Sequence, residues 1–306
     1  MPAGRQGLVM RSTAGFVDVL IGEEAVQCRV RGRLKQGRHD TDLCVIGDRV
    51  IVQTDEFTHV VTEVLPRQTR FSRRQPGRGA DKEDVLIANL QQLLVTFSFG
   101  QPLFNARLLD RFLAIAEHQG IDPVIIMNKV DLEQPGNADW QRTYESIGYP
   151  IVNVSARSGS GIEPLRKLLG DKISAFVGPS GVGKSSLINE ILPALELGVA
   201  EVSDHHGKGR HTTRVASLYP LPGRGFLADT PGIRELGTWA LPIEELDRCF
   251  PEFAHWRTSC AFRSCSHTHE PRCAVIDAAN DGRIDRERYE SYVRLREDTA
   301  TRPSSH

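Results

Sequence analysis

The stretch Ile173-Ser-Ala-Phe-Val-Gly-Pro-Ser-Gly-Val-Gly-Lys-Ser-Ser-Leu-Ile-Asn189 decides the fold of this 306-residue chain. Residues 173–177 are mostly apolar and predict a buried strand, while residues 186–189 predict the start of a helix. The segment between them, 178–185, fits G-x-x-x-x-G-K-[ST], in which backbone N–H groups surround phosphate oxygens. Because a strand precedes the motif and a helix follows it, we predict a P-loop rather than a chance match in a glycine-rich turn.

The residues of the predicted P-loop are expected to contact the phosphates and Mg²⁺. Lys184 is expected to reach the β- and γ-phosphates and Ser185 to bind Mg²⁺, while the helix N-terminus adds positive potential. The predicted phosphate-binding residues are Gly178, Pro179, Ser180, Gly181, Val182, Gly183, Lys184, Ser185 and Ser186. This motif indicates a nucleoside triphosphate and does not select the base.

A second motif selects guanine. Asn128-Lys129-Val130-Asp131 follows the apolar strand predicted over 124–127 and is similar to the N-K-x-D motif of GTPases. The carboxylate of Asp131 would accept two hydrogen bonds from the N1–H and N2–H₂ edge of guanine, which adenine does not offer. The stem of Lys129 would lie over the base, and Asn128 would tie neighbouring loops together.

Ser155-Ala156 follows the strand predicted over 151–154 and resembles the S-A motif whose backbone N–H groups meet guanine O6. The dipeptide is weak evidence by itself. It becomes strong evidence beside N-K-x-D and a P-loop, because all three motifs follow predicted strands.

Two further segments complete the expected triphosphate site. Asp229-Thr-Pro-Gly232 looks like D-x-x-G: Asp229 would hold Mg²⁺ through water and the N–H of Gly232 would contact the γ-phosphate. The alternative for this segment alone is an ordinary turn. In Gly209-Arg-His-Thr-Thr-Arg214, either Thr212 or Thr213 would complete the Mg²⁺ shell, and we favour Thr213.

The order of these motifs is permuted. In most GTPases the P-loop comes first, whereas here N-K-x-D and S-A precede it. A circular permutation is tolerable because domain termini often lie close together and each motif follows its own strand. The chain leaves the GTPase domain just after D-x-x-G, which moves with the γ-phosphate. We therefore hypothesise that the nucleotide state repositions the domain that follows.

A metal site is predicted near the C-terminus. Cys260-x₄-Cys265-x-His267-x₅-Cys273 offers three thiolates and one imidazole, the closed tetrahedral set of a structural Zn²⁺ site. The alternative is a group of buried free cysteines, and His269 is a substitute for His267 as a ligand. Cys28, Cys44 and Cys249 lie outside the cluster and are expected to pack in cores.

The remaining sequence indicates a multidomain protein of α/β plus β class. Alternation over residues 26–31 predicts half-buried strands and a small β-barrel, of the OB or the SH3-like type. We predict four regions: 1–66, an OB-fold-like RNA-binding domain; 67–84, a basic linker; 85–238, a circularly permuted GTPase domain with a mostly parallel sheet; and 239–306, a zinc-binding domain with a helical tail.

Charge and hydropathy limit the partners. The formal net charge of -1 gives no sign of a nucleic-acid partner, but Arg67, Arg70, Arg73, Arg74 and Arg78 lie between Pro66 and Ala80 without an acid. A solvated surface would have the same composition. No apolar run of 18 residues and no apolar signal core is present, so a cytoplasmic protein without a membrane partner is expected.

The N-K-x-D motif, the P-loop, Gly209-Arg-His-Thr-Thr213, D-x-x-G and the Cys/His set together resemble the motifs of the RsgA or YjeQ family, circularly permuted GTPases of ribosome biogenesis that depend on the small subunit. The resemblance covers nearly the whole chain. It implies an N-terminal OB-fold, a permuted GTPase domain and a C-terminal zinc domain, with Mg²⁺ and GTP or GDP as ligands. It also implies binding to the small ribosomal subunit and its rRNA, a role in late subunit maturation, and weak GTP hydrolysis that the subunit stimulates.

The resemblance points to a catalytic histidine. Many GTPases place a glutamine after D-x-x-G to orient the attacking water, but here that residue is Ile233, so intrinsic hydrolysis should be slow. In the family the Gly-Arg-His-Thr-Thr loop supplies a histidine, which is His211 here; the alternative is that His211 only packs or contacts RNA. Two departures from the family are Arg214, in place of a third threonine, and Gln91, near which we expect an aspartate.

Three functions fit the sequence. The first is a subunit-stimulated GTPase in small-subunit assembly. The second is a GTP-dependent binding module or nucleotide sensor in which hydrolysis is incidental. The third is a GTPase that acts on another RNA such as tRNA. A monomer is expected, because no exposed apolar patch or heptad repeat is evident.

Overall fold

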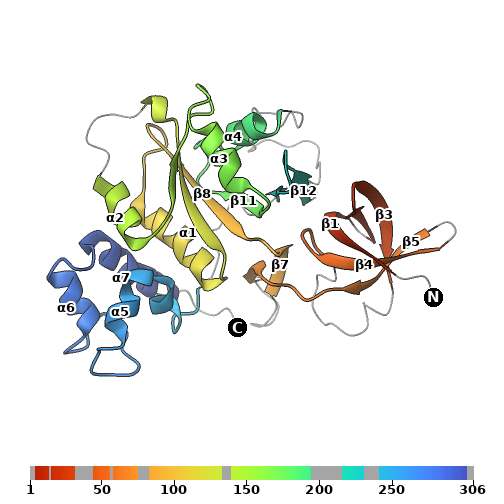
Figure 1. Cartoon of the computed structure of the whole chain (residues 1–306). Coiled ribbons are helices and arrows are strands. Elements are labelled where there is room, and N and C mark those ends of the chain that lie inside the picture. Colours follow the sequence, from red (N-terminus) through yellow and green to blue (C-terminus); the bar gives the residue numbers. More distant parts are fainter. Residues whose placement is uncertain are drawn as a thin grey trace, which may run out of the picture.

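The chain folds into three parts that follow one another in sequence (Figure 1). The structure, a computed structural model, describes residues 4–13, 15–31, 44–55, 58–74, 83–132, 139–193, 216–230 and 241–301. A β-barrel is followed by a layered α/β domain and then by a helical domain that packs beneath the α/β layers. None of the helices in these ranges is long and apolar enough to cross a bilayer.

The N-terminal part is a closed five-stranded barrel. Its strands run in the order β1-β2-β3-β5-β4, and β4 closes the barrel by pairing with β1. The bounds are β1 Arg5–Thr13, β2 Phe16–Ile21, β3 Glu24–Val30, β4 Arg49–Asp55 and β5 Thr58–Val64. Along β2, Val17, Val19 and Ile21 are buried and alternate with less buried residues, as a half-buried strand requires. This arrangement confirms the OB-like barrel.

The α/β domain is a six-stranded sheet in the order β10-β9-β8-β11-β13-β12. All neighbours are parallel except β12, which runs antiparallel to β13. The strands are β8 Gln92–Ser98, β9 Asp122–Asn128, β10 Ile151–Asn153, β11 Ile173–Val177, β12 Ser217–Pro220 and β13 Phe226–Asp229. Helices cover both faces, which is why β8 and β11 are buried along their whole length.

The two faces of the sheet have separate cores. One contains β8 residues Leu93, Val95 and Phe97 with α1, and the other contains Leu94 with α3 and α4 (Figure 1). The helices are α1 Ala106–His118, α2 Asp139–Ile147, α3 Ile162–Leu169 and α4 Lys184–Ile191, with the short 3₁₀ helix η2 Val130–Leu132. The predicted mostly parallel α/β sheet is confirmed.

The region predicted as a linker over 67–84 contains structure. β6 Arg70–Arg74 and β7 Glu83–Ala88 form an antiparallel pair between the barrel and the sheet. Phe71 is fully buried, and the side-chain amide of Gln119 exchanges two 3.1 Å hydrogen bonds with the backbone of Ser72. These two bonds hold β6 against the end of α1. Ser72 and Gln119 are 47 positions apart in the sequence, so local composition does not reveal this contact.

The barrel is joined closely to the α/β domain. Arg11 of β1 pairs with Ser217 of β12, so one hydrogen-bonded sheet runs through both. Gly47 has a φ of +84°, and a Cβ there would lie 2.0 Å from the carbonyl oxygen of Ala88, so this turn requires glycine. Asn89 donates to the carbonyl of Gly47 at 2.8 Å and fixes the same contact.

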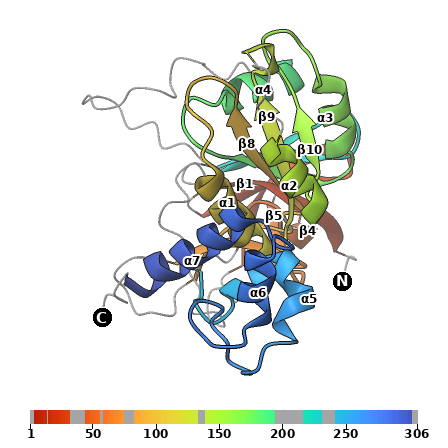
Figure 2. The same cartoon turned by 90° about the vertical axis from the view of Figure 1, so that its left-hand side faces the viewer.

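The described part of the C-terminal domain consists of four short helices and one longer helix. They are the 3₁₀ helices η6 Leu246–Cys249 and η7 Pro251–Phe253, followed by α5 Ala254–Arg257, α6 Ala274–Asn280 and the longer α7 Arg286–Thr301. The domain contacts α1 through η6 and α7. Figure 2 shows α7 crossing α1, with α5 and α6 beneath it. The buried residues of the two domains form one continuous apolar cluster, which confirms the predicted helical C-terminal domain.

A buried arginine anchors this domain. Arg288 is 2% exposed; its Nε and Nη2 donate to the two carboxylate oxygens of Glu252 at 2.7 and 3.1 Å, and its Nη1 donates to Asp110 of α1 at 2.6 Å. Phe250 lies under the guanidinium at 4.6 Å. The two carboxylates raise the pKa of Arg288 against the opposing effect of burial, so the charge persists.

We expect Arg288→Met to lower the free energy of unfolding by about 3–5 kcal/mol, because the carboxylates of Glu252 and Asp110, 12% and 1% exposed, lose the positive charge that neutralises them. Arg142→Met is the matched control, since its side chain is 80% exposed and should change the value by less than about 0.5 kcal/mol. Urea unfolding measures both. Equal values for the two variants would show that the buried network does not anchor the domain.

Candidate nucleotide and metal sites

The predicted guanine and phosphate motifs gather at one edge of the sheet. β9 ends at Asn128, β10 at Asn153, β11 at Val177 and β13 at Asp229. Since these strands are parallel, their carboxyl ends and the loops that follow lie at the same edge. The permuted chain therefore assembles the motifs in space although their order along the sequence differs.

Asn128 links the loops at this edge. Its buried side-chain amide donates to the carbonyl of Val182 in the P-loop at 2.8 Å, and its Oδ1 accepts from the backbone N–H of Ala156 at 3.2 Å. One side chain thus spans the base-reading motif, the phosphate loop and the S-A motif. Gly183 leaves room for it, because a Cβ there would lie 2.3 Å from Nδ2 of Asn128.

The P-loop connects β11 to α4. Lys184 is 8% exposed and donates to the carbonyl oxygens of Gly178 and Pro179 at 2.7 and 2.6 Å, which curls the loop around its ammonium group. Gly178 has a φ of +136°, and a Cβ there would meet the carbonyl oxygen of Thr96 at 2.1 Å. Ser185 lies in the first turn of α4, where it is buried with Lys184.

The residues predicted to read the base lie beside this loop. Asp131 accepts a 2.6 Å hydrogen bond from the hydroxyl of Ser155, which is fully buried, so one carboxylate oxygen is oriented by the S-A motif. Lys129 donates to the carbonyls of Gly181 and Gln101. Burial lowers the pKa of Lys129, and the nearby Asp131 opposes that shift.

Sequence reasoning missed Gln101, which belongs to the loop after β8. The backbone carbonyl of this residue makes the contact with Lys129, so no side-chain signal identifies it. The neighbouring Pro102 lies near the P-loop, since a Cβ on Gly181 would come within 3.6 Å of its Cδ. This loop therefore lies against both the N-K-x-D segment and the P-loop.

Four predicted residues lie outside the described part of the chain: His211, Thr212, Thr213 and Gly232. Asp229 is described and ends β13 at the expected edge. Thr230 follows it, and its hydroxyl is buried without a hydrogen-bond partner among the residues that the structure describes. The described part of the D-x-x-G segment, Asp229 and Thr230, therefore lies at the same sheet edge as the other motifs.

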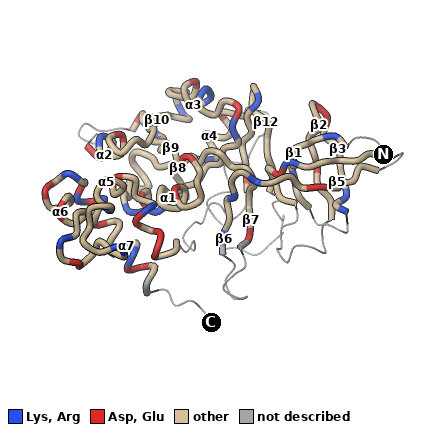
Figure 3. The backbone as a smooth tube through the Cα atoms, turned by 60° about the horizontal axis from the view of Figure 1, so that its bottom comes forward, with Lys and Arg blue, Asp and Glu red and all other residues tan. Residues whose placement is uncertain are grey.

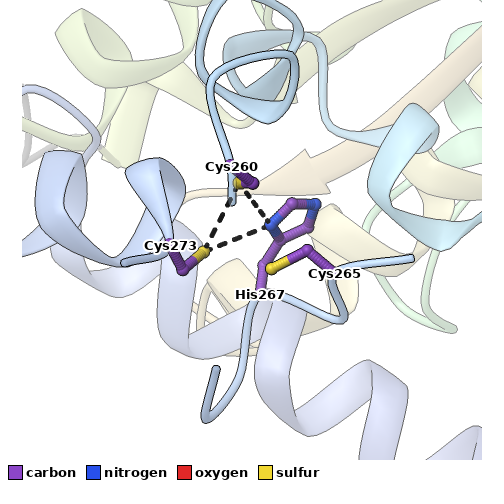
Figure 4. Close-up of side chains that lie close together, drawn as sticks. All are labelled: Cys260, Cys265, His267 and Cys273. Atoms are coloured by element: carbon purple, nitrogen blue, oxygen red, sulfur yellow. Dashed lines mark hydrogen bonds between the residues drawn. The ribbon is translucent and has the colours of Figure 1, made fainter. Parts of the chain in front are cut away.

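The four predicted metal ligands converge in the C-terminal domain (Figure 4). The Nδ1 atom of His267 lies 3.3 Å from Sγ of Cys273 and 3.5 Å from Sγ of Cys260, and these two sulfurs are 3.8 Å apart. With Sγ of Cys265, all four ligand atoms lie within 4.8 Å of one another. This cluster could hold a metal ion.

The surrounding residues orient the histidine. Tyr289 donates to the carbonyl oxygen of His267 at 3.0 Å, and Tyr292 donates to that of Ser266 at 2.7 Å. Nε2 of His267, on the side away from the cluster, lies 4.0 Å from a carboxylate oxygen of Asp247. Burial lowers the pKa of His267 against the effect of Asp247, which favours the neutral imidazole that metals bind.

Fold and site together define a circularly permuted P-loop GTPase with an N-terminal barrel and a C-terminal Cys/His cluster. Family models match two parts of the chain: "RsgA GTPase" over residues 64–239 and "RsgA N-terminal domain" over residues 6–60. The chain belongs to the RsgA GTPase family and is an enzyme that acts on GTP.

Relatives support this assignment over the full length. The small ribosomal subunit biogenesis GTPase RsgA of Gemmatimonas aurantiaca is 43% identical over 303 residues, covering 97% of this chain and 98% of that protein. The crystal structure of YjeQ from Thermotoga maritima is 32% identical with a TM-score of 0.80, covering 97% and 99%. YloQ, described as a circularly permuted GTPase, is 29% identical with a TM-score of 0.78, covering 99% and 97%.

Proposed function

We propose that this protein is a GTPase of small ribosomal subunit biogenesis that acts late in maturation and is stimulated by the subunit. The full-length relative from Gemmatimonas aurantiaca is named for that process. The assembly of the nucleotide motifs at one sheet edge carries the enzymatic part of the proposal. Work on ribosomal subunits would take place in the cytoplasm, and we propose that the protein works there as a monomer.

Guanine recognition is the step that the described residues support best. Asp131, oriented by Ser155, would accept from N1–H and N2–H₂ of the base, while Lys129 would lie over the ring. The backbone N–H groups of Ser155 and Ala156 would meet O6. Val130 and Ser186 complete the set of nucleotide contacts proposed from the sequence.

The donor atoms fit the two metals implied by the family. We propose Mg²⁺ at Ser185, with Asp229 acting through water and Thr213 or Thr212 completing the set. For Zn²⁺ we propose Cys260, Cys265, His267 and Cys273, because three thiolates and one imidazole are the donors that this ion takes in closed structural sites. The zinc ion would stabilise the fold of the C-terminal domain and supply no catalytic group.

We propose that His211 orients the attacking water, because Ile233 cannot. His211→Ala is then expected to keep GTP affinity within about threefold and to lower subunit-stimulated turnover by about 10²-fold or more. His205→Ala in the same stretch is the matched control and should turn over normally. Single-turnover hydrolysis with saturating small subunits checks both variants, and unchanged stimulated turnover in His211→Ala would refute the catalytic role.

Fewer arginines of the basic stretch 67–78 are available to contact rRNA than the sequence indicates. Arg67 donates to both carboxylate oxygens of Asp48 at 2.7 and 2.9 Å and is 13% exposed, so it stabilises the barrel junction instead of facing RNA. Arg73 pairs with Asp84 but stays 44% exposed. We propose that the exposed basic residues of β6 and the barrel rim contact rRNA phosphates.

Turnover with different RNAs tests the whole proposal. GTP hydrolysis is measured for the protein alone and with small subunits, large subunits or bulk tRNA. Strong stimulation by small subunits only is the expected result, and the stimulated rate should fall steeply with salt. Tight GTP-dependent subunit binding without stimulation would favour the binding module, and stimulation by tRNA would overturn the proposed partner.

A further inference from the structure

A polar cavity of about 450 Å³ lies at the junction between the barrel and the α/β sheet. Its polar lining residues are Gln6, Arg49, Gln68, Asn89, Gln91, Asp171 and Arg224. Asp171 and Arg224 precede β11 and β13, whereas the nucleotide motifs follow these strands, so the cavity lies at the opposite edge of the sheet. Figure 3 shows basic residues on both sides of this junction, near β1 and β12.

The charges in the cavity favour an anion. Neither Arg49 nor Arg224 forms an ion pair within the described ranges, and Asp171 is the one carboxylate among the lining residues. The neighbouring Arg67 differs, because Asp48 neutralises it. Two guanidinium groups against one carboxylate leave an excess positive charge, and guanidinium groups bind phosphate through paired N–H donors.

Neutral groups line the rest of the cavity. The side-chain oxygen of Gln91 accepts from the backbone N–H of Ile173 at 3.1 Å, which holds this side chain in place while its amide N–H₂ remains available. Gln6 and Gln68 add further amides, and Phe226, which is partly buried and packs against the apolar core, adds apolar lining. Proteins bind nucleobases with amides, which form hydrogen bonds to the polar edges of the base, and with aromatic rings that lie beside it.

The cavity is already formed by the fold. Asn89 accepts from the backbone N–H of Gln68 at 2.8 Å and donates to Gly47, which joins the barrel turn to the sheet on one side. On the other side, Gly225 packs so closely that a Cβ there would lie 2.4 Å from the carbonyl oxygen of Gly170. These contacts hold the backbone around the pocket, while its charged and glutamine side chains stay exposed to an incoming ligand. A pocket of this size suits a small ligand, since such sites span roughly 300–1,000 Å³.

We propose that this cavity binds one nucleotide unit, with its phosphate on Arg49 and Arg224 and its base against the amides and Phe226. The unit is either a free mononucleotide or one nucleotide of an RNA strand, because both present the same phosphate and base. A ligand there contacts the barrel and the sheet at once, so binding would stiffen the joint between them. The inference does not depend on the proposed ribosomal function.

The test uses full-length protein saturated with Mg²⁺ and GDP, so that the guanine site is filled. Equilibrium dialysis measures binding of AMP, UMP, inorganic phosphate and a four-nucleotide RNA. Arg49→Gln and Arg224→Gln are each expected to weaken nucleotide binding about tenfold or more. Gln91→Glu, nearly isosteric and still an acceptor for Ile173, should weaken it similarly by adding negative charge.

Arg142→Gln is the matched control, because Arg142 is 80% exposed on α2, far from the lining residues, and should bind as the parent does. GDP affinity and thermal unfolding show that each variant is folded. Binding of AMP or UMP identifies a free nucleotide, and binding of the RNA alone with the same dependence identifies an RNA strand; both support the proposal. The proposal is overturned if the three substitutions leave nucleotide binding unchanged, if phosphate binds as tightly as a nucleotide, or if nothing binds.

Discussion

Asp131→Asn is expected to lower GTP affinity by about 10²–10⁴-fold. Two hydrogen bonds from the guanine edge to a carboxylate are lost, and each is worth about 1.5–3 kcal/mol. The asparagine oxygen can still accept from Ser155 as Asp131 does at 2.6 Å, so the loop should keep its shape. The asparagine N–H₂ then faces the N–H donors of guanine, which adds repulsion to the loss.

The same substitution should improve binding of xanthosine triphosphate, because xanthine carries a carbonyl at C2 where guanine carries an amino group. Asp139→Asn is the matched control, since Asp139 is 92% exposed at the start of α2 and touches no nucleotide motif. Fluorescent-nucleotide titrations measure both triphosphates. A variant that keeps full GTP affinity and gains nothing for xanthosine triphosphate would show that Asp131 does not read the base.

Much of the fold could be predicted because its signals are local. The P-loop is a short pattern between a strand and a helix, and the Cys/His cluster spans only 14 residues. The alternation in the barrel strands likewise follows from a period of two. Such features depend on neighbours in sequence, and the structure contains them where the patterns indicate.

The contacts that join the three parts could not be predicted. Arg288 and Asp110 are separated by 178 residues, and both look like ordinary surface charges in a polar helix pattern. Arg67 belongs to a basic stretch of the sequence, yet its partner Asp48 lies in the barrel turn. Ion pairs between residues far apart in the sequence depend on the topology of the chain, which the amino-acid composition does not reveal.

The Arg288 anchor bears on how the nucleotide state reaches the C-terminal domain. The sequence suggested that this domain moves because it follows D-x-x-G. The anchor ties it to α1 and, through Thr143 and Asp285, to α2, which follows the N-K-x-D motif. A nucleotide-dependent change would therefore have to carry α1 along or break a buried ion pair, and hydrogen exchange after residue 245 with GDP and a GTP analogue measures which occurs.

Cys273→Ser should empty the metal site and unfold the C-terminal domain. Structural zinc contributes roughly 10–16 kcal/mol of apparent binding free energy to small domains, and serine is a far weaker ligand than thiolate. Cys273 also immediately precedes α6, so loss of the ion frees the start of that helix. We expect the metal content to fall from about one zinc per chain to near zero, and proteases to cut after residue 241.

Cys249→Ala is the matched control, because Cys249 is a buried thiol in the same domain that lies outside the cluster. It should keep its zinc and resist proteolysis. GDP binding should survive in Cys273→Ser, since the nucleotide loops belong to the α/β sheet and the cluster to the helical domain. If Cys273→Ser instead remained protease-resistant and the parent protein contained no zinc, the cluster would be a group of packed free cysteines, and the apolar contacts with α1 alone would hold the domain.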